Sequence, residues 1–218
     1  LRGMKRRLKN KLLQIVNKFR SEEQRMLMLL GQSKSEQVIQ KSDVNLLSEV
    51  EFRVFSQYGE DGIIQYLVSK IDIPNKIFVE FGVENYIEAN TRFLLINNNW
   101  SGMVIDGDAS NIDYIKNDTI YWRNNITAVH SFITKENINA LISSYTSVQD
   151  IGILSVDIDG NDYWVLGAID VVKPRILICE YNNVFGGEHA VTVPYAPDFV
   201  RRNACLLYTS DAADDTPC

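Results

Sequence analysis

Carboxylate side chains stand at the ends of several short apolar segments in the middle of this chain. Glu80 and Asp106 each close such a segment, and Asp157 and Glu180 hold equivalent places in two later ones. Carboxylates accept hydrogen bonds from hydroxyl groups, bind cations and exchange protons with substrates. If the apolar segments are neighbouring strands of one sheet, the four side chains belong to one site.

The apolar segments alternate with segments of helical periodicity, which predicts a doubly wound α/β fold with a parallel sheet. The predicted strands cover residues 77–81, 102–106, 126–132, 151–157 and 175–181. Helices are predicted between them over residues 91–97, 111–116, 135–144 and 162–171. Because right-handed crossovers join parallel strands, the carboxyl ends of the strands share one edge, and the acids converge there.

The loop after the first strand indicates which ligand this edge binds. A dinucleotide site needs the glycines of G-x-G-x-x-G, which bring backbone N–H groups onto a pyrophosphate. Gly82 is the only glycine here, and Glu84 and Glu88 would repel a pyrophosphate. A cationic ligand without phosphates, such as S-adenosylmethionine (SAM), suits the loop better. The alternative is that Glu80 caps or pairs locally and binds no ligand.

Asp106 ends the second strand, where an acid can accept hydrogen bonds from ribose hydroxyls. NAD and SAM both contain a ribose, so this position predicts a nucleoside without choosing between them. Asp108 is predicted to be the N-cap of the next helix.

The densest acidic cluster follows the fourth strand. Asp157 and Asp159, with Glu180 and Asn182 of the neighbouring strand, are predicted ligands of a divalent cation such as Mg²⁺. Asp157 and Asp159 could equally hold the ammonium group of a cofactor or the hydroxyl of an acceptor. Asp162 is predicted to be an N-cap or first-turn acid.

The chain has two histidines. His189 lies in a loop just beyond the fifth strand, on the substrate side of such folds, so it is a candidate general base together with Asp159. A loop histidine without a catalytic role fits the position equally well. His130, in or just after the third strand, is predicted to be structural.

The charge is distributed unevenly along the 218 residues, which carry a net charge of −6. Residues 1–20 contain eight basic residues and no acid, so the remainder has 14 basic and 28 acidic residues and a net charge of −14. This acidic body argues against nucleic acid as the main partner. Three cysteines without a CxxC motif favour a cytoplasmic setting over a disulfide framework or a zinc site.

Residues 1–50 are predicted to form a basic helical extension, with helices over 4–30 and 36–50. A basic amphipathic helix can lie on an anionic membrane, bind a partner, or pack on its own domain or a second copy. A further helix is predicted over 61–70. Residues 203–218 lack any helical or strand period and are predicted to be a non-native read-through tail.

Several motifs together resemble a group of largely uncharacterised bacterial proteins that look like class I SAM-dependent methyltransferases, distantly similar to the FkbM family. The motifs are Phe55-Ser-Gln-Tyr-Gly-Glu-Asp-Gly62, Phe78-Val-Glu-Phe-Gly82, Asn90-Thr-Arg-Phe-Leu-Leu95, Trp100-Ser-Gly-Met-Val-Ile-Asp-Gly107, Val156-Asp-Ile-Asp-Gly160 and Cys179-Glu-Tyr-Asn182. The resemblance covers residues 52–202 and implies a methyltransferase-like domain over 51–202. It also implies two further strands, which the chain lacks, so the fifth strand would be an exposed edge.

The resemblance implies roles for individual residues. Glu80 and Gly82 match the first SAM motif, Asp106 the ribose-binding acid, and Asp157 and Asp159 the motif beside the reaction centre. The implied activity is methyl transfer from SAM to an oxygen of a small-molecule or glycan acceptor. The alternatives are a non-catalytic binding protein of the same fold and a nucleotide or nucleotide-sugar enzyme.

Overall fold

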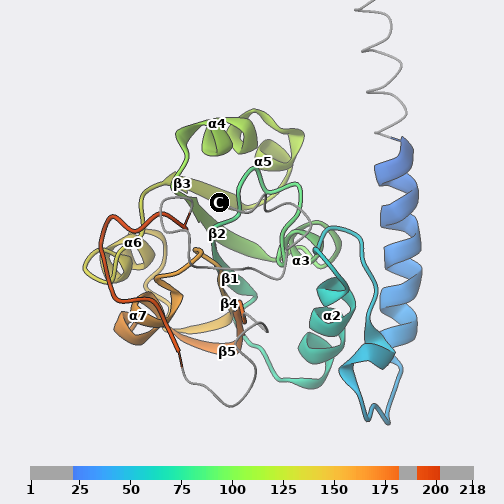
Figure 1. The fold of residues 1–218 in the computed structure, drawn as a ribbon. Coiled ribbons are helices and arrows are strands. Elements are labelled where there is room, and N and C mark those ends of the chain that lie inside the picture. The colour runs from blue at the N-terminus through green and yellow to red at the C-terminus, as the bar shows by residue number, and fades with distance from the viewer. Residues whose placement is uncertain (1–21, 182–190, 202–218) are drawn as a thin grey trace, which may run out of the picture. The chain divides into compact units, whose positions relative to one another are not determined.

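The structure, a computed structural model drawn in Figure 1, describes residues 22–181 and 191–201. The chain divides into two compact units between Lys70 and Ile71. The boundary predicted from the sequence lies after residue 50, twenty residues earlier. The later division follows from contacts of the helix that ends at Lys70: Gln65 accepts a hydrogen bond from Ser35 Oγ at 2.8 Å.

The first unit contains a helix over residues 22–39, the 3-10 helix η1 (Leu47–Val50) and helix α2 (Glu60–Lys70). The helix predicted over 36–50 is therefore wrong, because the chain leaves the helix after residue 39. Glu49 explains part of the difference: its Oε1 accepts hydrogen bonds from the backbone N–H groups of Asn45 and Leu46, at 3.2 and 3.0 Å. These local bonds favour a short capped turn over a continued helix.

A buried carboxylate organises the segment before α2. Asp61 Oδ2 accepts hydrogen bonds from the backbone N–H groups of Val54, Phe55 and Ser56 at 2.7, 2.7 and 2.8 Å. A Cβ on Gly62 would lie 2.0 Å from the carbonyl oxygen of Val50, so only glycine fits this contact. The motif around Asp61 and Gly62 thus shapes the backbone of the first unit.

The second unit is an α/β structure with a five-stranded parallel sheet in the order β3-β2-β1-β4-β5 (Figure 1). The strands are β1 (Ile77–Phe81), β2 (Ser101–Asp106), β3 (Ile126–His130), β4 (Asp150–Val156) and β5 (Lys173–Cys179). The predicted parallel sheet is confirmed. The main shift is in β5, which begins two residues earlier than predicted and includes Pro174. Among the described strands β5 lies at the edge of the sheet, and proline is tolerated in edge strands.

Helices flank the sheet. They are α3 (Arg92–Asn97), α4 (Ala109–Asn117), α5 (Thr119–Arg123), α6 (Ile138–Tyr145) and α7 (Asp162–Ala168). Helix α5 was not predicted; the Asp118 side chain caps it by accepting a hydrogen bond from Ile120 N at 3.0 Å. Helices α6 and α7 cover one face of the sheet, where Ile138, Ile142 and Val165 join the core, and α3 lies on the other face (Figure 1).

Among the described helices, none is long and apolar enough to cross a membrane.

Candidate functional site

The sheet has a topological switch point between β1 and β4, because the chain continues from β1 to β2 on one side and from β4 to β5 on the other. Ligands of open α/β sheets bind outside the carboxyl ends of the strands at such a point. The last level of paired residues consists of Phe81, Ile105, Val156 and Cys179. One residue beyond this level lie three of the acids, Asp106, Asp157 and Glu180. Glu80 lies one residue before it. The four acids therefore share this edge of the sheet.

Glu80 is buried and holds the loop that follows β1. Its Oε1 accepts a hydrogen bond from Asn90 N at 2.9 Å. Its Oε2 accepts hydrogen bonds from Thr91 N at 3.1 Å and from Thr91 Oγ1 at 2.5 Å. Because these two residues immediately precede α3, Glu80 closes the loop onto the start of that helix. This geometry agrees with the local capping role that the sequence analysis kept as an alternative.

Gly82 lets the ends of β1 and β4 approach each other. Its φ is +68°, a conformation that favours glycine, and a Cβ here would lie 1.6 Å from the carbonyl oxygen of Asp157. The glycine is therefore required by the contact between two strand ends, whether or not a ligand also approaches it.

Asp106 joins two loops at the end of β2. Its Oδ2 accepts a hydrogen bond from Glu84 N at 2.8 Å, and its Oδ1 accepts from Asp108 N at 2.8 Å and Asn111 Nδ2 at 3.0 Å. These bonds use three of the roughly four lone-pair sites of a carboxylate. Asp108 caps α4, as predicted, by accepting from Ser110 N at 2.8 Å.

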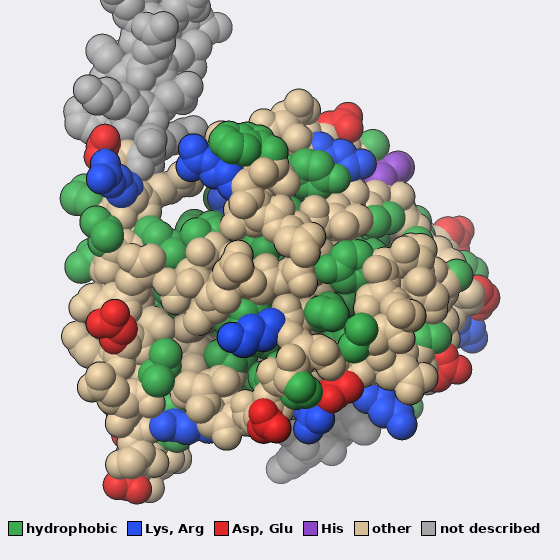
Figure 2. Space-filling view, turned by 180° about the vertical axis from the view of Figure 1, so that it is seen from behind, with side chains coloured by type: hydrophobic (Ala, Val, Ile, Leu, Met, Phe, Trp, Pro, Cys, Tyr) green, Lys and Arg blue, Asp and Glu red, His purple; other side chains and the backbone are tan. Residues whose placement is uncertain are grey.

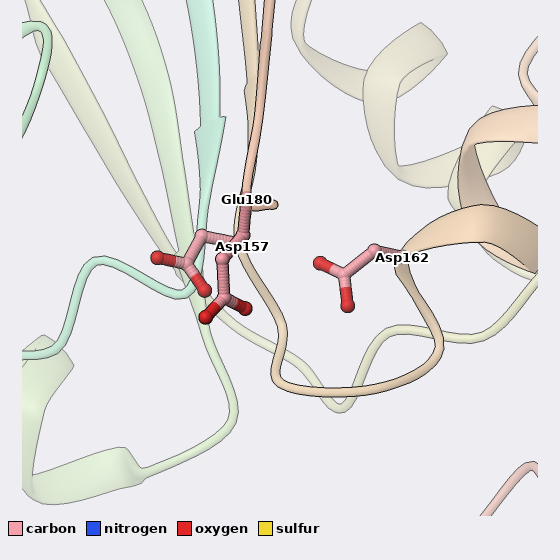
Figure 3. Close-up of side chains that lie close together, drawn as sticks. All are labelled: Asp157, Asp162 and Glu180. Atoms are coloured by element: carbon pink, nitrogen blue, oxygen red, sulfur yellow. The ribbon is translucent and has the colours of Figure 1, made fainter. Parts of the chain in front are cut away.

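Three carboxylates converge between the ends of β4 and β5 and the start of α7 (Figure 3). Asp157 and Glu180 lie side by side at the two strand ends, and Asp162 faces them from the first turn of α7. Each offers an oxygen, and these oxygens all lie within 4.8 Å of one another. Such a set of oxygen donors suits a hard divalent cation, and it also suits an ammonium group.

Burial and repulsion between carboxylates raise the pKa of two members of the cluster, Asp157 and Glu180. Asp157 is in contact with water, but the protein atoms around its carboxyl partly desolvate it. This desolvation raises the pKa of Asp157 to about 8, and repulsion from the neighbouring acids adds to the rise; these acids are Glu180, Asp159 and Asp162. Desolvation and then repulsion from Asp159 and Asp162 raise the pKa of Glu180. The Asp157 carboxyl therefore holds a proton near neutral pH, and a bound cation would displace it.

Asp162, which was predicted to have only a helix-terminal role, belongs to this cluster and also has that role. Its Oδ1 accepts from Ile158 N at 2.7 Å and its Oδ2 from Gly160 N at 2.8 Å. Its position in the first turn of α7, directly after the loop from β4, is the feature of the sequence that could have indicated its membership of the cluster.

Asp159, predicted as a catalytic residue and metal ligand, is not a member of the cluster. It lies in the turn between β4 and α7 with a φ of +57° and forms an ion pair with Arg201. Segment 191–201 packs on the same turn: Asn161 Nδ2 donates to Ala196 O at 2.8 Å, and a Cβ on Gly160 would lie 2.3 Å from the Phe199 ring. This segment directs the Asp159 side chain toward Arg201.

Asn182 and His189, predicted as a metal ligand and a catalytic base, lie outside the described residues. His130 ends β3, and its Nε2 lies 3.1 Å from Gly107 O, a local contact that fits the predicted structural role.

Comparison with known proteins gives no match: no family model, curated protein or solved structure is significantly similar to the chain.

Proposed function

We propose that this protein is a SAM-dependent methyltransferase that modifies an oxygen of a small or sugar-like acceptor. The observation that carries the proposal is the carboxylate cluster of Asp157, Asp162 and Glu180 beside the switch point of a parallel sheet. A switch point favours a nucleoside ligand, and converging carboxylates favour a cationic one. SAM combines a nucleoside with a sulfonium and an ammonium group.

The start of α3 disfavours a dinucleotide at the same edge. In a dinucleotide site the N–H groups at the start of the first helix bind the pyrophosphate. Here the N–H groups of Asn90 and Thr91 donate to Glu80, and α3 has only six residues. Because Glu80 already occupies these two donors, they are not available to a pyrophosphate.

The residues fit SAM at some positions better than at others. Glu80 and Gly82 have structural tasks that account for them. Asp157 and Glu180 have raised pKa values, and a cationic ligand would favour their charged forms. Asp106 keeps one lone-pair site for a ribose hydroxyl. SAM, when bound, would supply a methyl group on a positively charged sulfur.

The acceptor proton needs a base at the same edge. Asp157 is the better candidate within the described residues, because its raised pKa lies near neutral pH. The Asp159 side chain is instead engaged in an ion pair with Arg201. His189 stays a prediction. The remaining catalytic effect would come from holding the acceptor oxygen in line with the methyl group.

A divalent cation is the second ligand that the cluster could hold, bound by Asp157, Asp162 and Glu180. Thermal unfolding with and without MgCl₂ tests this set. We expect Mg²⁺ to raise the Tm of the wild type and of Asp159→Asn, but not of Asp157→Asn. An equal rise in all three proteins would rule out this set of ligands.

Isothermal titration of the full chain with SAM tests the main proposal. We expect measurable heat, and a loss of affinity of at least tenfold in Asp157→Asn, because one charge that faces the cationic ligand is removed. Absence of heat, together with no protection from unfolding, would overturn the proposal.

Two further measurements separate the alternatives. SAM binding without turnover on any sugar or small hydroxylated acceptor would favour a non-catalytic binding protein. An increase in NADH fluorescence with the chain would favour a dinucleotide or nucleotide-sugar enzyme.

A further inference from the structure

Residues 191–201, red in Figure 1, lie along the turn between β4 and α7. Side chains of the turn and of the helix hold this segment, which we call the strap. Trp164 Nε1 donates a hydrogen bond to Val193 O at 2.8 Å, and Asn161 Nδ2 donates one to Ala196 O at 2.8 Å. The strap is therefore attached to the same turn that carries the acids of the strand-end site.

Aromatic side chains of the strap add further contacts. The Phe199 ring packs against Gly160, where a Cβ would lie 2.3 Å from the ring. Tyr195 donates its hydroxyl to Glu136, which precedes α6, and the Lys135 ammonium lies 4.1 Å from the centre of the Tyr195 ring. Contacts from the turn, from α7 and from the segment before α6 thus fix the strap at several points.

The last residue of the strap brings a positive charge to the acidic edge of the sheet. Arg201 forms an ion pair with Asp159, and the two side chains are 26% and 51% exposed. The same charge also reaches the carboxylate cluster. Desolvation and repulsion from neighbouring acids raise the pKa of Glu180, and the positive charge of Arg201 opposes that rise. Arg201 therefore acts on the negative charges that a cationic ligand would neutralise.

We propose that the strap opposes the binding of cations at the strand-end site, with Arg201 as an internal cation that a ligand must displace. The inference rests on the cation binding proposed above for Asp157, Asp162 and Glu180. A bound cation and the Arg201 guanidinium would repel each other at the same edge. Since water reaches both members of the Asp159–Arg201 pair, the pair contributes little stability and can be replaced.

Isothermal titration with MgCl₂ tests the proposal. We expect Arg201→Gln to bind Mg²⁺ about three- to tenfold more tightly than the wild type, because a positive charge leaves the acidic edge. Phe199→Ala should also bind Mg²⁺ more tightly, by about twofold or more, because it loosens the strap without changing its charge. The two variants separate the charge of the strap from its attachment.

Arg175→Gln is the matched control for charge. Arg175 pairs with Asp150 at the end of β4 opposite the acids, and the two side chains are 44% and 38% exposed. On the face shown in Figure 2, Lys and Arg side chains are dispersed among acidic ones, so a general effect of net charge would be similar at many basic positions. Arg175→Gln measures that general effect and should leave Mg²⁺ affinity unchanged.

Phe132→Ala is the control for the loss of an aromatic ring. Phe132 is 45% exposed and its ring, like that of Phe199, lies beside a glycine, here Gly107. It follows β3, away from the strap, so its substitution should also leave Mg²⁺ affinity unchanged.

Hydrogen exchange of the wild type gives a reciprocal readout, because a strap that weakens cation binding must itself be weakened by a bound cation. Saturating MgCl₂ should speed exchange in peptides that cover residues 193–199 by about threefold or more, and should not speed it in β1. Slower exchange of these peptides with MgCl₂ would overturn the proposal.

The titrations distinguish failure of the strap from failure of the cation site. Equal Mg²⁺ affinity of the wild type and Arg201→Gln, or an equal gain in Arg175→Gln, would refute the role of Arg201 and leave the cation site in place. A gain in Arg201→Gln without any gain in Phe199→Ala would refute the role of the strap. If neither the wild type nor these variants bound Mg²⁺, the cation site would fail, and this inference with it.

Discussion

Gly82 illustrates at the scale of one residue how the strand-end site is assembled. Its left-handed conformation and its approach to Asp157 O leave no space for a side chain. Asp157 in turn is the acid whose pKa is most clearly raised in the site. A change at Gly82 would therefore disturb both the packing of β1 against β4 and the position of the carboxylate cluster.

Replacing Gly82 with alanine should lower the free energy of unfolding by about 2 kcal/mol or more, because a left-handed backbone penalty adds to a steric clash. Urea denaturation measures the change. Gly167→Ala is the control: a Cβ there meets no atom within 4 Å, and the residue is in helix α7. This control should stabilise the protein by about 0.5–1 kcal/mol. Equal effects of the two substitutions would contradict the close approach at Gly82.

The raised pKa of Asp157 makes stability depend on pH. Since the folded-state pKa of about 8 exceeds the ordinary value of 3.8, the native state binds more protons than the unfolded state between these pH values. The contribution of Asp157 to stability therefore falls as the pH rises through this window.

We expect the stability of the wild type relative to Asp157→Asn to fall between about pH 4 and pH 8, because the substitution removes the titrating group. Urea denaturation at a series of pH values measures this difference. Asp113→Asn, on the exposed side of α4, changes the net charge equally and should show no such trend. A constant difference for Asp157→Asn would mean that its carboxyl titrates normally.

At the scale of elements, the start of α2 depends on one carboxylate. Asp61 Oδ2 serves three backbone donors from the preceding segment and the hydroxyl of Ser56 at 3.0 Å. Desolvation outweighs these hydrogen bonds and raises the pKa of Asp61, which shows how deeply the group is placed. Its hydrogen bonds fold the segment back onto the helix.

Asp61→Ala should destabilise the protein by about 3 kcal/mol, because several buried N–H groups lose their acceptor. Chemical denaturation measures the loss. Asp43→Ala provides the comparison: Asp43 accepts one exposed hydrogen bond, from Ser42 Oγ at 3.1 Å, and its removal should change stability little. If the two substitutions had similar effects, the loop would not depend on Asp61.

At the scale of the whole molecule, the central strands should form the most stable part of the second unit. β1 and β4 have strand neighbours on both sides and are buried almost throughout, whereas among the described strands β3 and β5 have one neighbour each. The side chains of β5 alternate between exposed positions and positions that are partly buried or, at Ile176, buried.

Hydrogen exchange followed by mass spectrometry should therefore show the slowest exchange in β1 and β4 and faster exchange in β3 and β5. The reason is that opening a central strand breaks two hydrogen-bond ladders and the largest apolar contacts. Faster exchange in β1 than in β5 would contradict the observed strand order.

The elements were predictable where local pattern and tertiary setting agree. Residues 77–81 are apolar apart from Glu80, and the observed strand β1 has the predicted bounds. The prediction was wrong over residues 40–50, where short polar residues and Glu49 stabilise turns, although residues 36–39 are helical as predicted. It missed α5, whose five residues are too few for a periodic signal and depend on the Asp118 cap.

The sequence by itself determined that strands and helices alternate, and therefore that acids share one edge of a parallel sheet, because the period of apolar residues is a local property. Only the tertiary structure decided which acids meet. Asp162 joins Asp157 and Glu180, while Asp159 turns to Arg201. The direction of the Asp159 side chain depends on the left-handed backbone at this residue and on Arg201, which lies 42 residues further along the chain. Contacts over such distances leave no periodic signal, so their outcome cannot be inferred from spacing.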